Sequence, residues 1–390
     1  MALAGLVWAL AAASSDAQAQ AQAEVRGLWV VRTGLASPEA VDQVVEQAAA
    51  GGFNTLLVQV RGRGDAFYHS SLVPRSPVLQ PRVGDFDPLA RLLERARAKN
   101  LQVHAWVNVL LSAHFGQPLP PGHMFERHPD WVMVPRKVAR AALHAKGAAL
   151  LRLVAQASDR AEAEGYYVSP SAPGLAEHLD SVVRELLRRY PVDGLHLDFI
   201  RYPSGEFDYS RHALESFRAA YGGDLLAPLL RPSPSWDEHR RSILTALARR
   251  LAGAARDERP GLMVSAAVVP SEAEAVNHKF QTWPAWIASG MLDAICPMAY
   301  TPDHDLFRAQ IESARALARP GQGVWAGVGA YRLSIDEVVR NIAAARQIGA
   351  SGVVLFSHES LDGPALETLR RQAFTRPPLL AGMPAIFTQP

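Results

Sequence analysis

Apolar and polar positions follow two different periods along the chain from residue 24 onward. Short apolar runs predict eight β-strands, which are Val25 to Val31, Asn54 to Val60, Leu101 to Asn108, Asp193 to Phe199, Leu262 to Val269, Leu292 to Met298, Gly323 to Gly329 and Gly352 to Ser357. Segments with helical spacing separate or follow them: Pro38 to Ala50, Pro88 to Lys99, Leu175 to Tyr190, Trp236 to Ala255, Trp283 to Ser289, Leu306 to Ala318, Ile335 to Ile348 and Pro364 to Gln372. Strand and helix alternating eight times predict an α/β fold, a (β/α)8 TIM barrel.

The structural alternative is an open, doubly wound sheet. Such a sheet needs no eighth strand and usually carries a glycine-rich phosphate turn after its first strand. Here the first strand is followed by Arg32-Thr-Gly-Leu35, which is not a turn of that kind. The pattern therefore favours the closed barrel.

The third and fourth strands have one face that differs from the other. Because successive side chains of a strand point to opposite faces, the third strand places on one face Gln102, His104, Trp106 and Asn108. The fourth strand is expected to point Gly194, His196 and Asp198 into the barrel and Leu195, Leu197 and Phe199 outward. Polar side chains near the carboxyl ends of barrel strands are typical of an active site.

A long connection, residues 112–173, follows the third strand. It contains a Pro-rich piece at 116–122, the segment His128-Pro-Asp-Trp131 and an Ala-rich stretch near residues 138–164 that we expect to be helical. A long loop at the carboxyl end of a strand commonly builds part of a substrate site. We therefore expect this insertion to contribute to the site.

The two ends of the chain differ from the barrel segment, residues 24–374. Residues 2–13 form an apolar run that is followed by repeated Ala-Gln, which predicts a signal peptide over residues 1–23. We therefore expect an exported protein, periplasmic or secreted, with no segment integral to a membrane. Residues 375–390 are rich in proline and are expected to form a tail.

Charge and cysteine content exclude several classes of protein. Forty basic and 38 acidic residues leave a formal charge of +2, which is too balanced for a nucleic-acid-binding surface. The single cysteine, Cys296, rules out an intrachain disulfide and a Cys-rich zinc site. The first strand lacks a His-x-His pair and no cluster has metal-ligand spacing, so we expect no metal and no cofactor.

Asp198 is the leading candidate for a catalytic residue. It lies near the carboxyl end of a buried strand, and a buried carboxylate is costly unless it is paired or used. Neighbouring candidates for substrate contacts are His196, Arg201 and Tyr202. The alternative is a structural ion pair of Asp198 with Arg201 or Arg61. The catalytic partner of Asp198 could be one of three carboxylates that follow later strands, namely Glu272, Asp303 and Glu359.

Other candidate substrate-binding residues lie in or near the second, third and sixth strands. They are Gln59, Arg61, Asp65, His104, Trp106, Asn108, Trp283 and Tyr300. Aromatic faces suit sugar rings, and amide and guanidinium groups suit their hydroxyls. Each set also has a plain structural interpretation: solvated arginines in a turn for Arg61, a core histidine for His104, and core packing for Trp283.

These residues favour carboxylate chemistry on a polyol. No Gly-x-Ser-x-Gly elbow is present, which removes the usual serine hydrolase. Glycoside hydrolysis requires two carboxyl groups, one as acid and the other as nucleophile or base. The alternatives are a non-catalytic glycan-binding barrel and another polysaccharide-processing enzyme.

Several segments, in order along the chain, resemble one known family. They are Glu24-Val-Arg-Gly-Leu-Trp-Val30, Val58-Gln-Val-Arg61, Gly64-Asp65, Phe67-Tyr68, His104-Ala-Trp-Val-Asn108, His128-Pro-Asp-Trp131, Asp193-Gly-Leu-His-Leu-Asp-Phe-Ile-Arg-Tyr-Pro203 and Pro297-Met-Ala-Tyr300. Together they resemble glycosyl hydrolase-like family ten. The resemblance implies an exported TIM-barrel glycosidase, with relatives that act on peptidoglycan glycan strands stripped of their stem peptides.

The resemblance also implies roles for individual residues. It makes Asp198 catalytic and places Arg61, Asp65, Asn108 and Tyr300 along the site. The same segment is similar to chitinase-type barrels, but His196 and Ile200 stand where those enzymes carry acidic residues.

We therefore predict an exported glycoside hydrolase that acts on a bacterial polysaccharide, for which the resemblance implies peptide-free peptidoglycan glycan. Asp198 and Glu359 are its predicted carboxyl pair.

Overall fold

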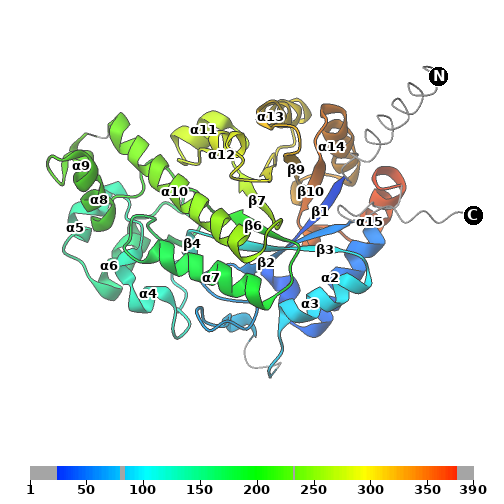
Figure 1. Ribbon diagram of the computed structural model, residues 1–390, viewed down its shortest axis with the longest axis horizontal. Coiled ribbons are helices and arrows are strands. Elements are labelled where there is room, and N and C mark those ends of the chain that lie inside the picture. The colour runs from blue at the N-terminus through cyan, green and yellow to red at the C-terminus, as the bar shows by residue number, and fades with distance from the viewer. Residues whose placement is uncertain (1–23, 80–83, 232, 376–390) are drawn as a thin grey trace, which may run out of the picture.

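The computed structural model describes residues 24–79, 84–231 and 233–375, and they form a closed barrel of eight parallel strands (Figure 1). The order around the barrel is β1-β10-β9-β8-β7-β6-β3-β2. The strands are β1 (Val25–Val30), β2 (Thr55–Arg61), β3 (Gln102–Asn108), β6 (Gly194–Asp198), β7 (Met263–Val268), β8 (Ala294–Pro297), β9 (Gly323–Gly329) and β10 (Gly352–Phe356). The predicted (β/α)8 barrel is confirmed.

Helices connect the strands and cover the outside of the barrel (Figure 1). They are α2 (Pro38–Gly51), α3 (Pro88–Ala98), α7 (Leu175–Arg189), α10 (Pro234–Glu258), α11 (Glu272–Asn277), α12 (Trp283–Ala288), α13 (His304–Leu317), α14 (Ile335–Ile348) and α15 (Gly363–Thr368). Side chains cap their first turns: Ser37 and Asp87 each accept a backbone N–H, at 3.2 and 3.0 Å. Ser334 and Glu337 form a capping box. These caps fix where the helices begin.

Two insertions depart from the simple alternation. The insertion after β3 holds β4 (Leu111–Ala113), α4 (Met124–Arg127), α5 (Ala139–Ala142), α6 (Gly147–Ala157) and β5 (Tyr166–Tyr167). Strands β4 and β5 pair antiparallel, and the predicted helical stretch ends at Ala157, so the prediction was wrong for residues 158–164. The insertion after β6, which the sequence pattern did not predict, adds α8 (Arg211–Tyr221) and α9 (Ala227–Leu230). The helices of both insertions gather at one end of the molecule (Figure 1).

The apolar core has an inner and an outer layer. The inner layer fills the lumen and consists of Trp29, Leu57, Trp106, Ala294, Cys296, Trp325 and Val354. The outer layer lies between strands and helices and includes Val103, Leu195 and Leu197. This division agrees with the predicted faces of the third and fourth strands, except at Phe199, which lies beyond the end of β6.

Two predicted segments, the signal peptide at 1–23 and the tail at 375–390, lie outside the described residues except for Thr375. Among the residues that the structure describes, no helix has the length and apolar character needed to cross a membrane.

Candidate active site

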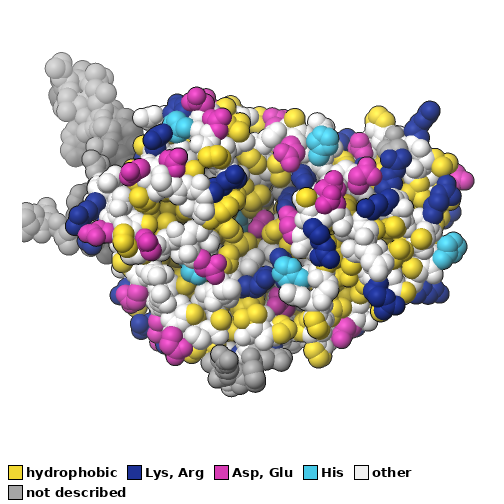
Figure 2. Space-filling model, turned by 180° about the vertical axis from the view of Figure 1, so that it is seen from behind, with side chains coloured by type: hydrophobic (Ala, Val, Ile, Leu, Met, Phe, Trp, Pro, Cys, Tyr) yellow, Lys and Arg dark blue, Asp and Glu magenta, His cyan; other side chains and the backbone are white. Residues whose placement is uncertain are grey.

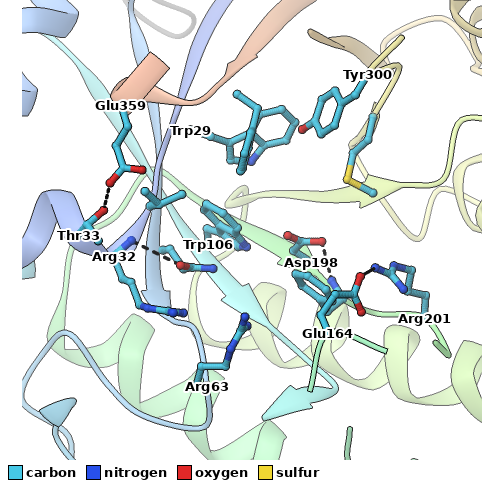
Figure 3. Close-up of a pocket in the computed structure, with 15 residues that line it drawn as sticks. Trp29, Arg32, Thr33, Arg63, Trp106, Glu164, Asp198, Arg201, Tyr300 and Glu359 are labelled. Carbon is cyan, nitrogen blue, oxygen red and sulfur yellow. Dashed lines mark hydrogen bonds and ion pairs between the residues drawn. The ribbon is translucent and has the colours of Figure 1, made fainter. Parts of the chain in front are cut away.

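A pocket of about 490 Å³ opens at the carboxyl ends of the barrel strands. Its lining combines acidic, basic and aromatic side chains: Trp29, Val31, Arg32, Thr33, Gln59, Arg63, Trp106, Glu164, Asp198, Phe199, Arg201, Met298, Tyr300, Phe356 and Glu359. Figure 2 shows a hollow near the middle of one face with charged side chains around it, and Figure 3 shows the pocket in detail. The position is the one at which TIM barrels carry their active sites.

Asp198 is the last residue of β6 and its carboxyl group faces this pocket. The side chain is largely buried, with the residue 7% exposed, and Oδ1 accepts the backbone N–H of Phe199 at 2.6 Å. Burial raises the pKa of Asp198 to about 6, although the Phe199 N–H and the charge of Arg201 act in the opposite direction. Asp198 can therefore hold a proton at mildly acidic pH.

The chain turns sharply after Asp198. Phe199 has a φ of +49°, a left-handed conformation that is uncommon for a bulky residue. The turn brings the Phe199 ring into the pocket, where the guanidinium carbon of Arg201 lies 4.9 Å from the ring centroid. The expected outward position of Phe199 was wrong because the strand ends one residue earlier.

Glu164, which the sequence analysis did not select, lies beside Asp198 (Figure 3). It comes from the insertion after β3, just before β5. Its carboxylate accepts a hydrogen bond from Arg201 Nη2 at 2.8 Å and another from the Tyr167 hydroxyl at 2.5 Å. Burial alone would raise the pKa of Glu164, but the Arg201 charge and the two hydrogen bonds lower it overall. Glu164 is therefore held in the ionised form.

Glu359 lines the same pocket from another direction. It follows β10, which is four strands away from β6 in either direction around the closed barrel. Its carboxylate accepts a hydrogen bond from the hydroxyl of Thr33, and the side chain is exposed at the rim (Figure 3). Asp198 and Glu359 thus start from opposite sides of the barrel.

Aromatic side chains form one wall of the pocket. Tyr300 meets Trp29 edge to face with ring centroids 6.1 Å apart, and it lies 5.6 Å from Phe356. Trp106 lies 6.4 Å from Phe356. Burial, together with Cys296 and Asp198, raises the pKa of the Tyr300 hydroxyl well above its ordinary value, so Tyr300 acts as a neutral hydroxyl. The wall offers ring faces and one polar group.

The second and third strands supply a support beneath the pocket. Asn108 is fully buried; its Oδ1 accepts Trp106 Nε1–H at 2.8 Å and its Nδ2 donates to Gly62 O at 2.9 Å. Gln59 Nε2 also donates to Asn108 Oδ1, at 3.5 Å, and Gln59 lines the pocket. Asn108 therefore orients two pocket residues without lining the pocket itself.

Arg61 does not reach the mouth of the barrel, as a shared face with Gln59 had predicted. The pairing of β2 with β3 shifts between these residues, so Arg61 pairs with Val107, whose side chain lies in the outer core. The Arg61 guanidinium is fully buried and donates to the backbone carbonyl of Asn108. It is neither a solvated turn residue nor an ion-pair partner of Asp198.

His104 and His196 are buried in the lumen and do not line the pocket. His196 Nδ1 lies 2.9 Å from Ser265 Oγ, and the His104 ring packs 5.6 Å from Trp325. Burial lowers their pKa values to about 4 and about 3, respectively, so both rings are neutral. The predicted substrate contacts of these histidines are corrected to core packing.

Three further predicted contacts also lie away from the pocket. Trp283 is fully buried and its Nε1–H donates to Val269 O at 3.1 Å. Tyr202 is buried against Phe280, with centroids 5.2 Å apart. Asp65 accepts the backbone N–H of Arg63 at 2.9 Å and lines a smaller neighbouring hollow. An apolar or aromatic pattern does not distinguish a packed wall from a pocket rim.

No cluster of three or more His, Cys, Asp or Glu side chains in residues 24–79, 84–231 and 233–375 is arranged to hold a metal ion. The chemistry that the pocket offers is that of carboxyl groups, arginines and aromatic rings.

Comparison with known proteins places the chain among glycoside-processing barrels. DigH of Escherichia coli K12, named a glycosyl hydrolase, is 24% identical over 280 residues, which cover 64% of this chain and 55% of DigH. The chain thus matches about half the length of that relative. YngK of Bacillus subtilis, also named a glycosyl hydrolase, is 23% identical over 402 residues, covering 91% of this chain and 71% of YngK.

Solved structures share the fold. The glycoside hydrolase domain of PgaB from Bordetella bronchiseptica superimposes with a TM-score of 0.64 at 13% identity, over 90% of this chain and 99% of that domain. The catalytic domain of β-amylase from Paenibacillus polymyxa gives 0.61 at 11% identity, over 91% and 98%. The model of the glycosyl hydrolase-like 10 family matches residues 24–319, and the resemblance seen in the sequence is confirmed: the chain belongs to this family.

Proposed function

We propose that the protein is a glycoside hydrolase in which Asp198 is the general acid and Glu164 is the ionised partner carboxylate. The observation that carries this proposal is a pair of neighbouring carboxyl groups whose surroundings change their pKa values in opposite directions. Burial raises the pKa of Asp198, whereas Arg201 and Tyr167 lower that of Glu164. Because the two pKa values are moved apart, one group is suited to donate a proton and the other to stabilise positive charge.

The reaction follows from these two states. Asp198 donates its proton to the leaving glycosidic oxygen as the bond to the anomeric carbon breaks, and positive charge develops on the sugar ring. The Glu164 carboxylate stabilises that charge, either by attack on the anomeric carbon or by activation of a water. The aromatic wall of Trp29, Trp106 and Tyr300 packs against the apolar faces of the sugar.

Glu359 is the carboxylate that the sequence suggested as the partner, and Glu164 is better supported. The paired carboxyl groups of glycosidases are separated by about 5 to 5.5 Å or roughly 6.5 to 9.5 Å. Glu164 interacts electrostatically with Asp198, while Glu359 starts from the opposite side of the barrel and contacts Thr33. We assign Glu359 a contact with the sugar hydroxyls at the pocket rim.

The proposed substrate is peptide-free peptidoglycan glycan, a bacterial polysaccharide. The chain's membership of the glycosyl hydrolase-like 10 family supports a glycan substrate. The sequence segments that resemble this family imply relatives that act on peptide-free strands. A pocket of about 490 Å³, lined by several aromatic rings, has room for more than one sugar-sized group.

Export to the periplasm or outside the cell is part of the same proposal. The apolar run at residues 2–13, followed by small residues, supports it. N-terminal sequencing of protein recovered from a periplasmic fraction should begin between about residues 19 and 24. Recovery of uncleaved protein from the cytoplasm alone would contradict export.

The test of the enzyme proposal is release of reducing ends from purified peptide-free glycan strands. Asp198→Asn and Glu164→Gln should each lower kcat by about 10² to 10⁴-fold, because each removes a group that acts in the transition state. Glu359→Gln is the matched comparison and should stay within about tenfold of the wild type. Binding of the strands without release of ends by the wild type would overturn the enzyme proposal, and the reverse ranking of Glu164 and Glu359 would overturn the assignment.

A further inference from the structure

Two arginines that the catalytic proposal does not use lie together at one side of the pocket (Figure 3). Arg32 follows β1, and Arg63 follows β2, which is the strand that pairs with β1. Both approach Gly62: its Cα would place a side-chain carbon 3.3 Å from Arg32 Nη1, and its carbonyl accepts Arg63 Nη1–H at 3.2 Å. Adjacent strands therefore deliver two guanidinium groups to one place.

Within the described residues, no carboxylate forms a direct ion pair with either guanidinium, although Asp65 and Glu164 act on Arg63 from a greater distance. In the described part of the chain, Arg32 Nη2 contacts only the ring of His114, at 3.2 Å, and the Arg63 side chain donates only to the Gly62 carbonyl. The Nε of Arg63 is buried without a hydrogen-bond partner. Neither arginine forms an ion pair with an Asp or Glu of the described residues, in contrast with Arg201 and Glu164 at 2.8 Å.

The nearby carboxylates are already engaged. Asp65 accepts the backbone N–H of Arg63, Glu164 is held by Arg201 and Tyr167, and Glu359 contacts Thr33. Two positive charges side by side without a direct ion pair are unfavourable, and their effect is visible in the neighbourhood. Burial and the charge of Arg32 lower the pKa of Arg63 to about 10, although Asp65 and Glu164 act in the opposite direction. Burial together with both arginines lowers the pKa of His114.

The two arginines also lie where the pocket continues. They line both the main pocket and an adjoining hollow of about 130 Å³, whose other lining residues include His114, Gln117 and Leu119. A glycan that reaches Asp198 and extends toward this hollow must pass the guanidinium groups. The arrangement is therefore suited to an anionic group carried by the substrate near the bond that is cut.

We propose that Arg32 and Arg63 form an anion subsite for a carboxylate substituent of a sugar ring next to the scissile bond. This inference rests on the proposed function and narrows it to acidic glycans. Guanidinium groups bind carboxylates with paired, directional hydrogen bonds. In peptidoglycan glycan the lactyl carboxyl group is free only after the stem peptide is removed, so the subsite accounts for recognition of peptide-free strands.

The test compares two forms of the same strands. One keeps its free carboxylates, and the other has them converted to neutral methylamides with methylamine and a carbodiimide. Wild-type kcat/KM should fall at least tenfold on the neutral strands, mainly through KM. Arg63→Gln and Arg32→Gln should show a similar fall on carboxylate strands and little further fall on neutral ones. Arg308→Gln, on the outside of α13, removes the same charge and should behave as the wild type.

Equal cleavage of both strands by the wild type would overturn the subsite and leave the glycosidase intact. If no strand is cleaved, the glycosidase proposal fails, and titration of the same strands into the wild type and Arg63→Gln by calorimetry decides the subsite. Tighter binding of the carboxylate form that requires Arg63 supports the subsite, while equal or absent binding overturns it. Arg63→Lys keeps the positive charge and should retain part of the preference for carboxylate strands over neutral ones. It therefore checks that the loss of activity in Arg63→Gln is not caused by misfolding.

Discussion

Asp198 and Glu164 illustrate how different immediate surroundings shift the pKa values of two neighbouring carboxyl groups in opposite directions. Asp198 is enclosed by the end of β6 and the aromatic wall, so its charged form lacks solvation. Glu164 stands at the pocket mouth, with its side chain 43% exposed, and receives hydrogen bonds from a charged and a neutral donor. Burial therefore determines the direction of the pKa shift at Asp198, and pairing with Arg201 and Tyr167 determines it at Glu164.

The first residue-scale prediction concerns the pH dependence of kcat/KM. Asp198 must be protonated and Glu164 ionised, so activity should be highest below pH 6 and above the lowered pKa of Glu164. Above about pH 6, kcat/KM should fall about tenfold per pH unit. The profile should be measured with strands over pH 4.5 to 8. A flat profile up to pH 8 would contradict Asp198 as the acid.

The second prediction at the residue scale concerns the pH dependence of folding stability. The folded pKa of Asp198 lies above its ordinary value of 3.8, so ionisation opposes folding: stability decreases as pH rises from about 4 to about 6 and is then constant. Asp198→Asn removes this penalty while keeping an acceptor for the Phe199 N–H. It should raise the free energy of unfolding by up to about 3 kcal/mol at pH 8.

Denaturant unfolding at pH 4 and pH 8 measures this effect, with little gain expected at pH 4. Asp257→Asn, at a side chain 67% exposed on α10, is the control and should show no such pH-dependent gain. If the Asp198→Asn protein is less stable than the wild type at pH 8, ionisation of the buried Asp198 carboxyl group does not destabilise the fold.

At the scale of elements, the antiparallel pairing of β4 with β5 places Glu164. Leu111 pairs with Tyr167 and Ala113 with Tyr166, which joins the end of the insertion to its beginning beside β3. Gly165 makes this pairing possible, because a side-chain carbon there would lie 2.1 Å from the carbonyl oxygen of Ala113. The proposed catalytic pair therefore depends on two paired strands that are separated by the 52 residues 114–165.

Tyr167→Phe tests this element. Loss of the hydroxyl removes one hydrogen bond to Glu164, so the pKa of Glu164 should rise and the acidic limb of the kcat/KM profile should move to higher pH. We expect the acidic limb to move up by about 1 to 2 pH units, since a hydrogen bond to a charged group contributes about 1.5 to 3 kcal/mol. Tyr167 acts here as a positioning residue.

Tyr166→Phe is the matched control. The Tyr166 hydroxyl donates to the carbonyl of Leu151 at 3.1 Å and does not touch Glu164. Its removal should leave the pH profile unchanged. A shift of the acidic limb in both variants would indicate a general disturbance of the paired strands β4 and β5 and not the loss of one hydrogen bond to Glu164.

At the scale of the whole molecule, closure of the barrel joins the first strand to the last. Gly352 of β10 lies directly opposite Val25 of β1, and a side-chain carbon there would lie 2.4 Å from the Val25 carbonyl oxygen. This seam lies on the same side of the barrel as Trp29 and Phe356, whose rings are 5.9 Å apart in the pocket wall. Fold closure and site shape are thus coupled.

Gly352→Ala should therefore destabilise the protein by roughly 1 to 3 kcal/mol, because the added carbon must displace backbone at the seam. Gly363→Ala is the control: no atom lies within 4 Å of the position that its side chain would take. Thermal unfolding followed by circular dichroism compares the two. Equal melting temperatures for both variants would show that the seam tolerates the carbon without cost.

The sequence by itself determined the barrel and the place of Asp198. Strand and helix periods depend on local side-chain spacing, and the carboxyl end of a strand is recognisable from where its apolar run stops. Family motifs and the lumen-facing residues could likewise be read from the chain. Gln59, Trp106, Arg201, Tyr300 and Glu359, all predicted from the sequence, line the same pocket as Asp198.

Only the tertiary structure decided which loop residues meet at that pocket. Glu164 lies at the end of the stretch that the sequence predicted to be helical, and its approach to Asp198 depends on the pairing of β4 with β5. The approach of Arg32 to Arg63 depends on the pairing of β1 with β2, and the inward or outward position of Arg61 depends on a one-residue shift between β2 and β3. Local spacing carries no information on distances between segments far apart in the chain, because packing of the whole barrel sets them.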